Sequence, residues 1–106
     1  MSTYIGDPRT HQVTKDGVPL QVHQPALNLS KQFDWGITGP STTQLALAIL
    51  MSVHGNMNQA VLLAKEFAIV ALVRDIEHGK PFTLTTEQIN AYIAEAHALK
   101  GEIHYR

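Results

Sequence analysis

The chain has 106 residues, enough for one domain and too few for two. It contains no cysteine, which excludes disulfides, thiolate zinc sites and cysteine nucleophiles and is typical of a reducing compartment such as the cytoplasm. Eight basic and nine acidic side chains give a formal net charge of −1, whereas nucleic-acid-binding proteins normally carry a basic excess. We therefore expect a cytoplasmic protein, and the charge disfavours nucleic acid as its partner. The sequence shows neither a secretion signal nor an apolar stretch long enough to cross a bilayer, so we expect no membrane association.

The first third of the chain, residues 1–32, predicts short strands joined by turns. Segments 11–14 and 18–20 flank Asp16-Gly17, a pair that favours the positive φ angles of a tight hairpin. Pro19 cannot donate a hydrogen bond to a neighbouring strand, so its strand is expected at a sheet edge. A further short extended piece is predicted over residues 26–29.

Residues 33–40 predict an ordered loop that connects the strands to the helices. Phe33 and Trp35 stand beside glycines in this segment. Because large aromatic side chains are costly to leave in water, we expect both to anchor the loop to the core.

Three helices are predicted over residues 41–100. Ser41 with Gln44 has the form of a capping box at the first helix, which should end at Gly55 and be largely buried. The second helix begins at either Asn56 or Asn58 and ends before residue 79. Its apolar window 60–73 is interpreted as a core helix, with a buried strand over 68–73 as the alternative.

The third helix has the clearest signals. Thr85 and Gln88 form a second capping box, and an apolar stripe follows at helical spacing. Lys100 and Gly101 are placed to end the helix, a cation and a left-handed stop at its C-terminus. Residues 101–106 are a short tail. We therefore predict a single α+β domain over residues 1–106, in which a small N-terminal antiparallel hairpin or sheet packs on three C-terminal helices.

No catalytic or metal signature emerges from these residues. None of the six histidines stands three or four positions from another, the spacing that brings two ligands together on a helix. No Gly-x-Ser-x-Gly nucleophile motif is present. We expect no catalytic residue, metal or cofactor, and the balance is against an enzyme.

One glycine-containing junction is a candidate ligand site, because a loop that opens a helix presents free N–H groups and a positive dipole end to an anion. The competing interpretation is a tight turn followed by a helix cap, and the lysine of a phosphate-binding P-loop is missing. The candidate ligand-binding residues are Trp35, Gly36, Thr38, Gly39, Ser41 and Thr42.

Several short motifs follow one another along the chain in a characteristic order. They are Tyr4-Ile5-Gly6, Asp16-Gly17-x-Pro19-Leu20, Phe33-Asp34-Trp35-Gly36, Gly39-Pro40 and Gln44-Leu45-Ala46-Leu47-Ala48. In this order they resemble a family of small uncharacterised bacterial, plasmid and phage proteins, a domain of unknown function, over the chain to about residue 85. This sequence has Ile37-Thr38 where the family is richer in glycine. The resemblance implies accessory genes of mobile elements, whose products often bind a host or defence component, and it implies no activity.

Three functions remain as hypotheses. The first is a non-enzymatic protein-interaction protein, encoded by a phage or plasmid, that acts through a protein partner or as a homodimer. The alternative is a small anion- or nucleotide-binding domain that uses the junction at the start of the first helix. The third is a nucleic-acid-associated protein.

Overall fold

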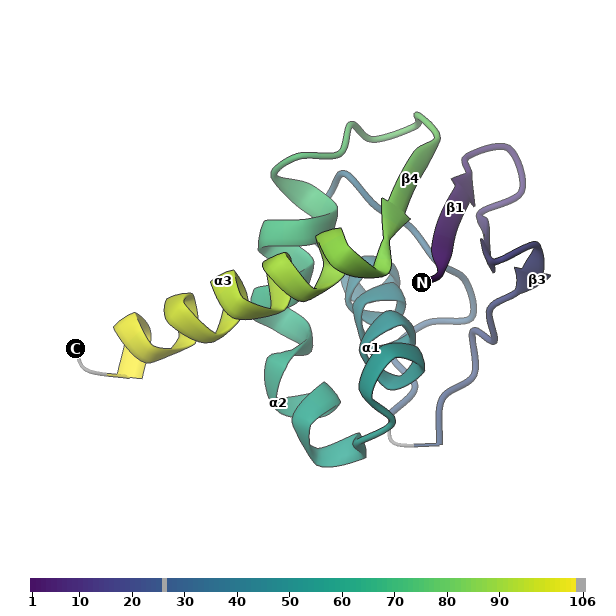
Figure 1. Cartoon of the computed structure of the whole chain (residues 1–106). Helices are drawn as coiled ribbons and strands as arrows, with labels where there is room; N and C mark the ends of the chain where they lie inside the picture. The colour runs from purple at the N-terminus through teal and green to yellow at the C-terminus, as the bar shows by residue number, and fades with distance from the viewer. Residues whose placement is uncertain (26, 105–106) are drawn as a thin grey trace.

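A computed structural model describes residues 1–25 and 27–104 of the chain (Figure 1). The elements in chain order are β1 (Thr3–Asp7), β2 (Gln12–Lys15), β3 (Val18–Pro19), α1 (Pro40–His54), α2 (Met57–Phe67), the π-helix η1 (Ala68–Val73), β4 (Phe82–Thr85) and α3 (Thr86–His104). The predicted α+β class is confirmed. Among the described residues no helix combines the length and the hydropathy that a membrane span requires.

The four strands form one antiparallel sheet in the order β3-β2-β1-β4. The predicted hairpin is present, with Asp16 at φ 52° and Gly17 at φ 82° between β2 and β3. Pro19 lies on the edge strand, as its missing N–H requires. The predicted extended piece over 26–29 is not a strand at residues 27–29, and residue 26 lies outside the described residues.

The fourth strand was not predicted. It comes from the segment between η1 and α3, where we expected only a helix cap, and it pairs with β1 so that Leu84 lies opposite Tyr4. Both of these side chains are buried. The sheet therefore joins the two ends of the domain, and Figure 1 shows β4 and the start of α3 beside the N-terminus.

The first helix forms the centre of the core. Residues Leu45 to Leu50 are all buried, which confirms the prediction, and α1 packs against α2 and η1. Gln44 is fully buried and ties the irregular segment before residue 30 to this helix: its Nε2 donates to the Val22 carbonyl at 2.7 Å, and its Oε1 accepts from the Leu29 N–H at 2.7 Å.

The start of α1 corrects the predicted capping box. The N-cap is Gly39 and Pro40 is the first helical residue, so Ser41 lies inside the helix and does not cap it. Proline is favoured at this position because its fixed φ suits a helix and its missing N–H costs nothing there. The hydroxyls of Ser41 and Ser30 share a hydrogen bond of 2.8 Å.

The other helix ends agree in part with the sequence. Gly55 ends α1 in a left-handed conformation, and Asn56 caps α2 by accepting from the Gln59 N–H at 3.1 Å. The residues that follow form the π-helix η1, so the alternative of a strand over 68–73 is wrong. The Thr85–Gln88 capping box of α3 is confirmed in both directions, at 3.2 and 2.9 Å.

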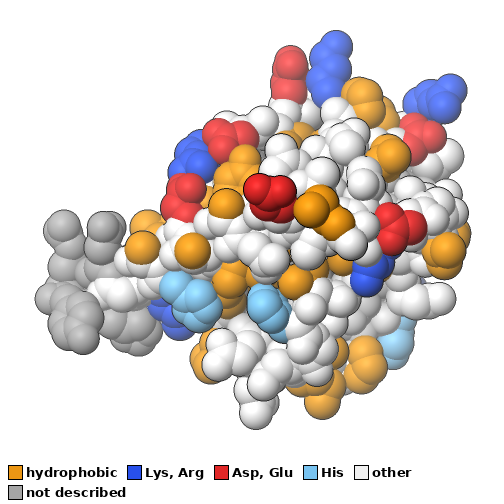
Figure 2. Space-filling view, in the orientation of Figure 1, with side chains coloured by type: hydrophobic (Ala, Val, Ile, Leu, Met, Phe, Trp, Pro, Cys, Tyr) orange, Lys and Arg blue, Asp and Glu red, His pale blue; other side chains and the backbone are white. Residues whose placement is uncertain are grey.

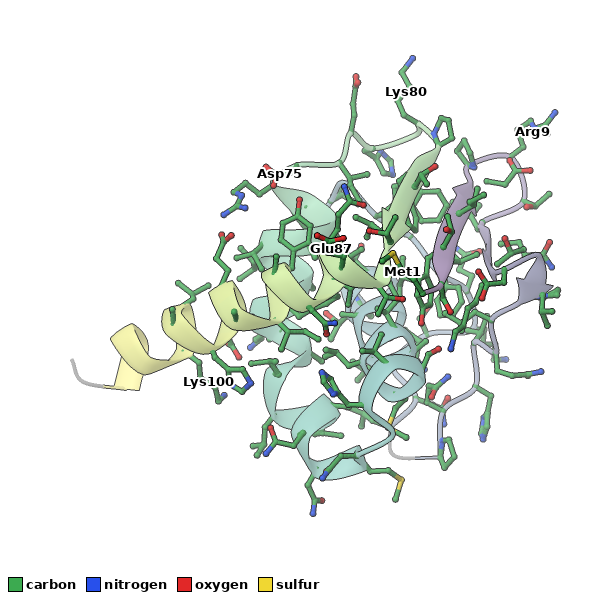
Figure 3. The ribbon with its side chains drawn as sticks, in the orientation of Figure 1. Met1, Arg9, Asp75, Lys80, Glu87 and Lys100 are labelled. Atoms are coloured by element: carbon green, nitrogen blue, oxygen red, sulfur yellow. The ribbon has the colours of Figure 1, made fainter. Side chains whose placement is uncertain are left out.

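The end of α3 was predicted wrongly. The helix continues through Gly101 to His104 instead of stopping there, while residues 105 and 106 lie outside the described residues. Lys100 does not complement the carbonyls of its own helix, because its Nζ donates to the Leu62 carbonyl of α2 at 2.8 Å. In Figure 3 this side chain points from α3 toward α2.

Candidate functional site

The junction between the sheet and α1 is built around a buried indole. Trp35 is 1 % exposed and packs edge-on against Phe82 of β4, with ring centroids 4.9 Å apart. Its Nε1 donates to the Lys80 carbonyl at 2.6 Å. Phe33 is also fully buried, so both aromatic side chains anchor the loop, as predicted. Trp35 is therefore part of the core and offers no surface to a ligand.

The next residue, Gly36, makes the closest backbone approach in this region. Its φ is +76°, and a Cβ built on it would lie 2.2 Å from the backbone nitrogen of His78. Its N–H donates to the Leu72 carbonyl at 2.6 Å. Because no side chain fits here, this position requires glycine for packing, and its N–H is not free for an anion.

The hydroxyl groups at the start of α1 already have partners within the protein. Thr42 is buried and donates to the Ile37 carbonyl at 2.6 Å, while Thr43 donates to the Gly39 carbonyl at 3.1 Å. The Thr43 N–H is also bonded to the Gly39 carbonyl, at 3.1 Å. An anion would have to compete with these bonds.

A cavity of about 310 Å³ nevertheless opens beside this helix end. Three of the six predicted residues line it, Thr38, Gly39 and Thr42, whereas Trp35, Gly36 and Ser41 do not. The opposite wall is contributed by α2 and η1, with Lys65, Ala68, Ile69 and Val73. Sequence reasoning missed this wall, because it placed the whole window 60–73 in the core.

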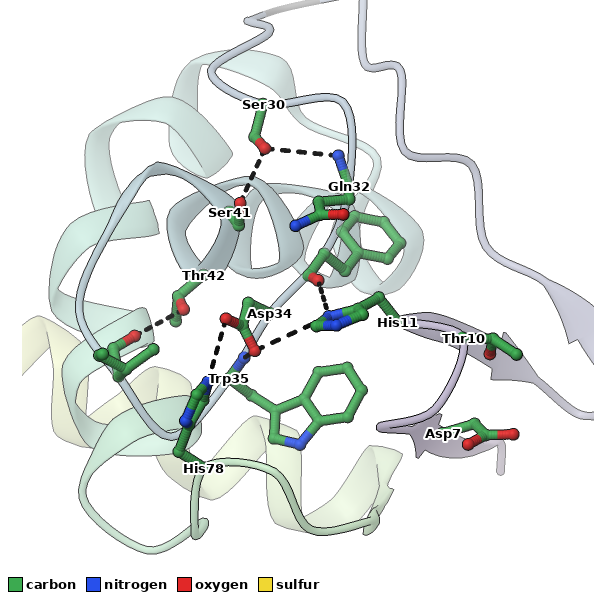
Figure 4. A network of polar contacts seen from close by, with 12 residues as sticks. Asp7, Thr10, His11, Ser30, Gln32, Asp34, Trp35, Ser41, Thr42 and His78 are labelled. Carbon is green, nitrogen blue, oxygen red and sulfur yellow. Dashed lines mark hydrogen bonds and ion pairs between the residues drawn. The ribbon is translucent and has the colours of Figure 1, made fainter.

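A second polar cluster, drawn in Figure 4, joins three distant segments at Asp34. One carboxylate oxygen accepts from the Trp35 N–H at 2.8 Å and lies 3.9 Å from His11 Nδ1, and the other lies 3.3 Å from His78 Nε2. His11 Nδ1 also donates to the Phe33 carbonyl at 3.0 Å. The cluster fastens the β1–β2 turn and the loop before β4 to the junction.

Among the described residues, two arrangements that would give this cluster a recognisable chemistry are missing. In residues 1–25 and 27–104, neither of the two imidazoles is hydrogen-bonded to a serine or threonine hydroxyl that could act as a nucleophile. Nor does the same part of the chain gather three His, Asp or Glu side chains in a geometry that holds a metal ion. The spacing of His11, Asp34 and His78 gives no signal in the sequence, since only the fold brings them together.

A third feature is an apolar surface on α2 and η1. Leu63, Ala64 and Phe67 face the core, but Met57, Val61, Leu62 and Ile69 are 48, 41, 59 and 42 % exposed. The interpretation of the whole window as a core helix is therefore wrong for its outer face. We call this outer face, with Val73 and the cation Lys65, the α2 face. Figure 2 shows hydrophobic side chains at the lower edge of the molecule, where Figure 1 places α2.

The chain is similar over most of its length to one described family. A family model with the description "Family of unknown function (DUF6166)" matches residues 4–95, a range that runs from within β1 to the first half of α3. No curated protein matches the chain. No solved structure matches it either.

Proposed function

The chain belongs to DUF6166, a family of unknown function, and we propose that it is a non-enzymatic protein-interaction domain. We extend the proposal to an accessory factor of a phage or plasmid that binds a host or defence component, as the resemblance in its motifs implies. The partner docks on the α2 face.

The observation that carries this proposal is the exposure of four large apolar side chains on one helical surface. Met57, Val61 and Leu62 lie on α2, and Ile69 follows on η1, all at least 41 % exposed. Single exposed apolar residues are common, but several large ones gathered on one face are typical of an interaction site, because burying them in a complex is favourable. π-Helices such as η1 are also frequent at functional sites.

The test compares what wild-type and altered chains capture from a bacterial lysate. Leu62→Gln and Val61→Gln remove apolar surface from the α2 face, whereas Val18→Gln removes it from β3, where Val18 is 66 % exposed. We expect a stoichiometric partner that the wild type and Val18→Gln retain and the two α2 variants lose. Circular dichroism confirms that all variants fold. The proposal is wrong if the four proteins capture the same set.

The cavity beside α1 favours a second candidate, an anion- or nucleotide-binding function. Thr38 and Lys65 border that cavity and supply a hydroxyl group and a cation. Phosphate or ATP at a hundredfold excess over its dissociation constant would stabilise such a domain by about 3 kcal/mol. A thermal scan with each ligand, repeated on Lys65→Gln, tests this candidate. Salt-sensitive binding to DNA or RNA would instead support the third, nucleic-acid hypothesis.

A further inference from the structure

The α2 face is a continuous ridge along one side of two consecutive helical elements. Met57, Val61, Lys65, Ile69 and Val73 recur every fourth residue through α2 and η1. In an α-helix each such step is displaced by about 40° around the axis, so the row winds obliquely along the helix. The wider turn of η1, closed by a bond of 3.0 Å from the Arg74 N–H to the Ile69 carbonyl, opposes this winding at the far end. From Met57 to Ile69 the ridge is about 18 Å long, at about 1.5 Å per residue.

A hollow lies at each end of this ridge. One is the cavity of about 310 Å³ between Ile69, Val73 and the start of α1. The other, of about 590 Å³, is bordered by Pro25, Met57 and Leu62. The second hollow is walled mainly by apolar side chains, and in the first Ala68, Ile69 and Val73 form an apolar wall opposite the threonines of α1. Each can therefore receive an apolar side chain of a partner.

The charge on the ridge has one sign. Lys65 lies between Val61 and Ile69 and is exposed, and none of the ion pairs found among the described residues involves it. The acidic residue of α2, Glu66, faces the other way: it is 9 % exposed, and its Oε1 lies 3.4 Å from Lys100 Nζ. A partner gains most by placing a carboxylate next to Lys65, since a cation covered without a counter-charge is costly.

This charge distribution disfavours a second copy of the chain as the occupant. In a two-fold dimer the same patch meets itself. The centre of the ridge, near Lys65, would then lie against the same region of the other copy, with no carboxylate on either face to separate the two cations. A partner with its own, acidic surface has no such conflict.

The backbone of the ridge selects the partner's conformation. An added strand needs the free N–H and C=O groups of a sheet edge, whereas the N–H and C=O groups of a helix interior are bonded within the helix. A ridge formed by every fourth side chain of a helix packs instead into the grooves of another helix.

Building on the proposed function, we propose that the α2 face binds an amphipathic helix of a partner protein, with a carboxylate set between large apolar side chains. The carboxylate pairs with Lys65, and the apolar side chains enter the hollows beside Met57 and Ile69.

The experiment selects binders from a displayed library of alanine-based helices of about 18 residues. One face of each helix is randomised among apolar, acidic, basic and amide side chains. The full chain is the target, in its wild-type form and as Lys65→Glu. Lys80→Glu is the charge-matched control, because Lys80 lies on the loop before β4 and points away from the body (Figure 3).

We expect the peptides selected by the wild type to carry Glu or Asp at one position flanked by Leu or Met. A labelled peptide of this kind should bind the wild type and Lys80→Glu at least tenfold more tightly than its Glu→Lys counterpart. Lys65→Glu should reverse the preference, and Leu62→Gln should weaken both peptides.

Two results would overturn the inference and leave the proposed function standing. The first is a set of peptides that need Leu62 but show no charge preference. The second is a wild-type dimer in light scattering that Val61→Gln converts to a monomer. If no selected peptide depends on Leu62, the inference fails as well, and the capture experiment with the Gln variants then decides the proposed function separately.

Discussion

The indole Nε1 of Trp35 donates to the carbonyl oxygen of Lys80 at 2.6 Å, across 45 residues of sequence. This bond holds the loop that leads into β4 against the junction that leads into α1. The same ring packs on Phe82, the first residue of β4. One side chain therefore aligns β4 with the helical layer.

Replacing this indole should cost more than the bond alone. Trp35→Phe leaves a partial cavity and an unmade bond at the Lys80 carbonyl, and we expect the free energy of unfolding to fall by about 2 to 4 kcal/mol. Tyr4→Phe is the control, because it removes the 2.8 Å hydrogen bond to Ser52 and little volume, and it should cost about 1 kcal/mol. Urea denaturation measures both. Equal losses would show that the indole contributes no more than a single hydrogen bond.

Replacing two of the glycines with alanine should change the free energy of unfolding in opposite directions. Gly36→Ala places a Cβ 2.2 Å from the His78 backbone nitrogen at a φ of +76°, so we expect a loss of at least about 2 kcal/mol. Gly101 lies within α3, and a Cβ there meets nothing within 4 Å. Gly101→Ala should therefore stabilise the protein by about 0.5 to 1 kcal/mol. Thermal denaturation gives both signs, and a neutral Gly36→Ala would contradict the packing described here.

The contact of Lys100 with α2 should couple energetically to Glu66. Lys100→Met removes the partner of a carboxylate that is only 9 % exposed and the donor to the Leu62 carbonyl, and we expect a loss of about 1 to 2 kcal/mol. In a Glu66→Met background the same change should cost much less, since no buried carboxylate is left unpaired. The four proteins form a double-mutant cycle in urea. Additive effects would exclude the proposed coupling.

Acid should weaken the fold partly through Asp16. The Thr3 N–H donates to its carboxylate at 2.9 Å, and this bond, ahead of one from Ser2, holds the pKa of Asp16 below its ordinary value of 3.8. A lowered pKa contributes stability above the pKa of the unfolded chain, and this contribution is lost as the pH falls through the folded value, that is, below about pH 4. Asp16→Asn keeps a residue that tolerates the left-handed conformation. The free energy of unfolding of this variant should fall less steeply as the pH is lowered.

The measurement is the free energy of unfolding between pH 6 and pH 2 for the wild type and Asp16→Asn. Asp7 and Asp75 also have a lowered pKa, chiefly through bonds from the Arg9 N–H and from the Arg74 side chain, so the variant should retain part of the slope. An unchanged slope would show that the turn carboxylate adds nothing to acid sensitivity.

The sequence by itself determined the features that depend on neighbours a few residues apart. The Asp16-Gly17 turn, the Gly55 stop and the Thr85–Gln88 box all follow from local backbone chemistry, and each is present. The cap of α2 is Asn56, one of the two asparagines that the sequence left open. The fold class followed from the same signals. The predicted capping box at Ser41 was wrong, because Pro40 occupies the first helical position and the Ser41 hydroxyl bonds to Ser30, a contact that local spacing does not reveal.

Only the tertiary structure decided β4, the surroundings of the junction and the exposed side of α2. The strand forms by pairing with β1, where Leu84 lies opposite Tyr4, a contact between segments far apart in the sequence that no local preference encodes. Of the predicted site residues, packing against Phe82 placed Trp35 in the core, and α2 and η1 enclosed Thr38, Gly39 and Thr42 in a cavity. The window 60–73 is apolar on both faces, so its composition could not show which face the core covers and which remains for a partner.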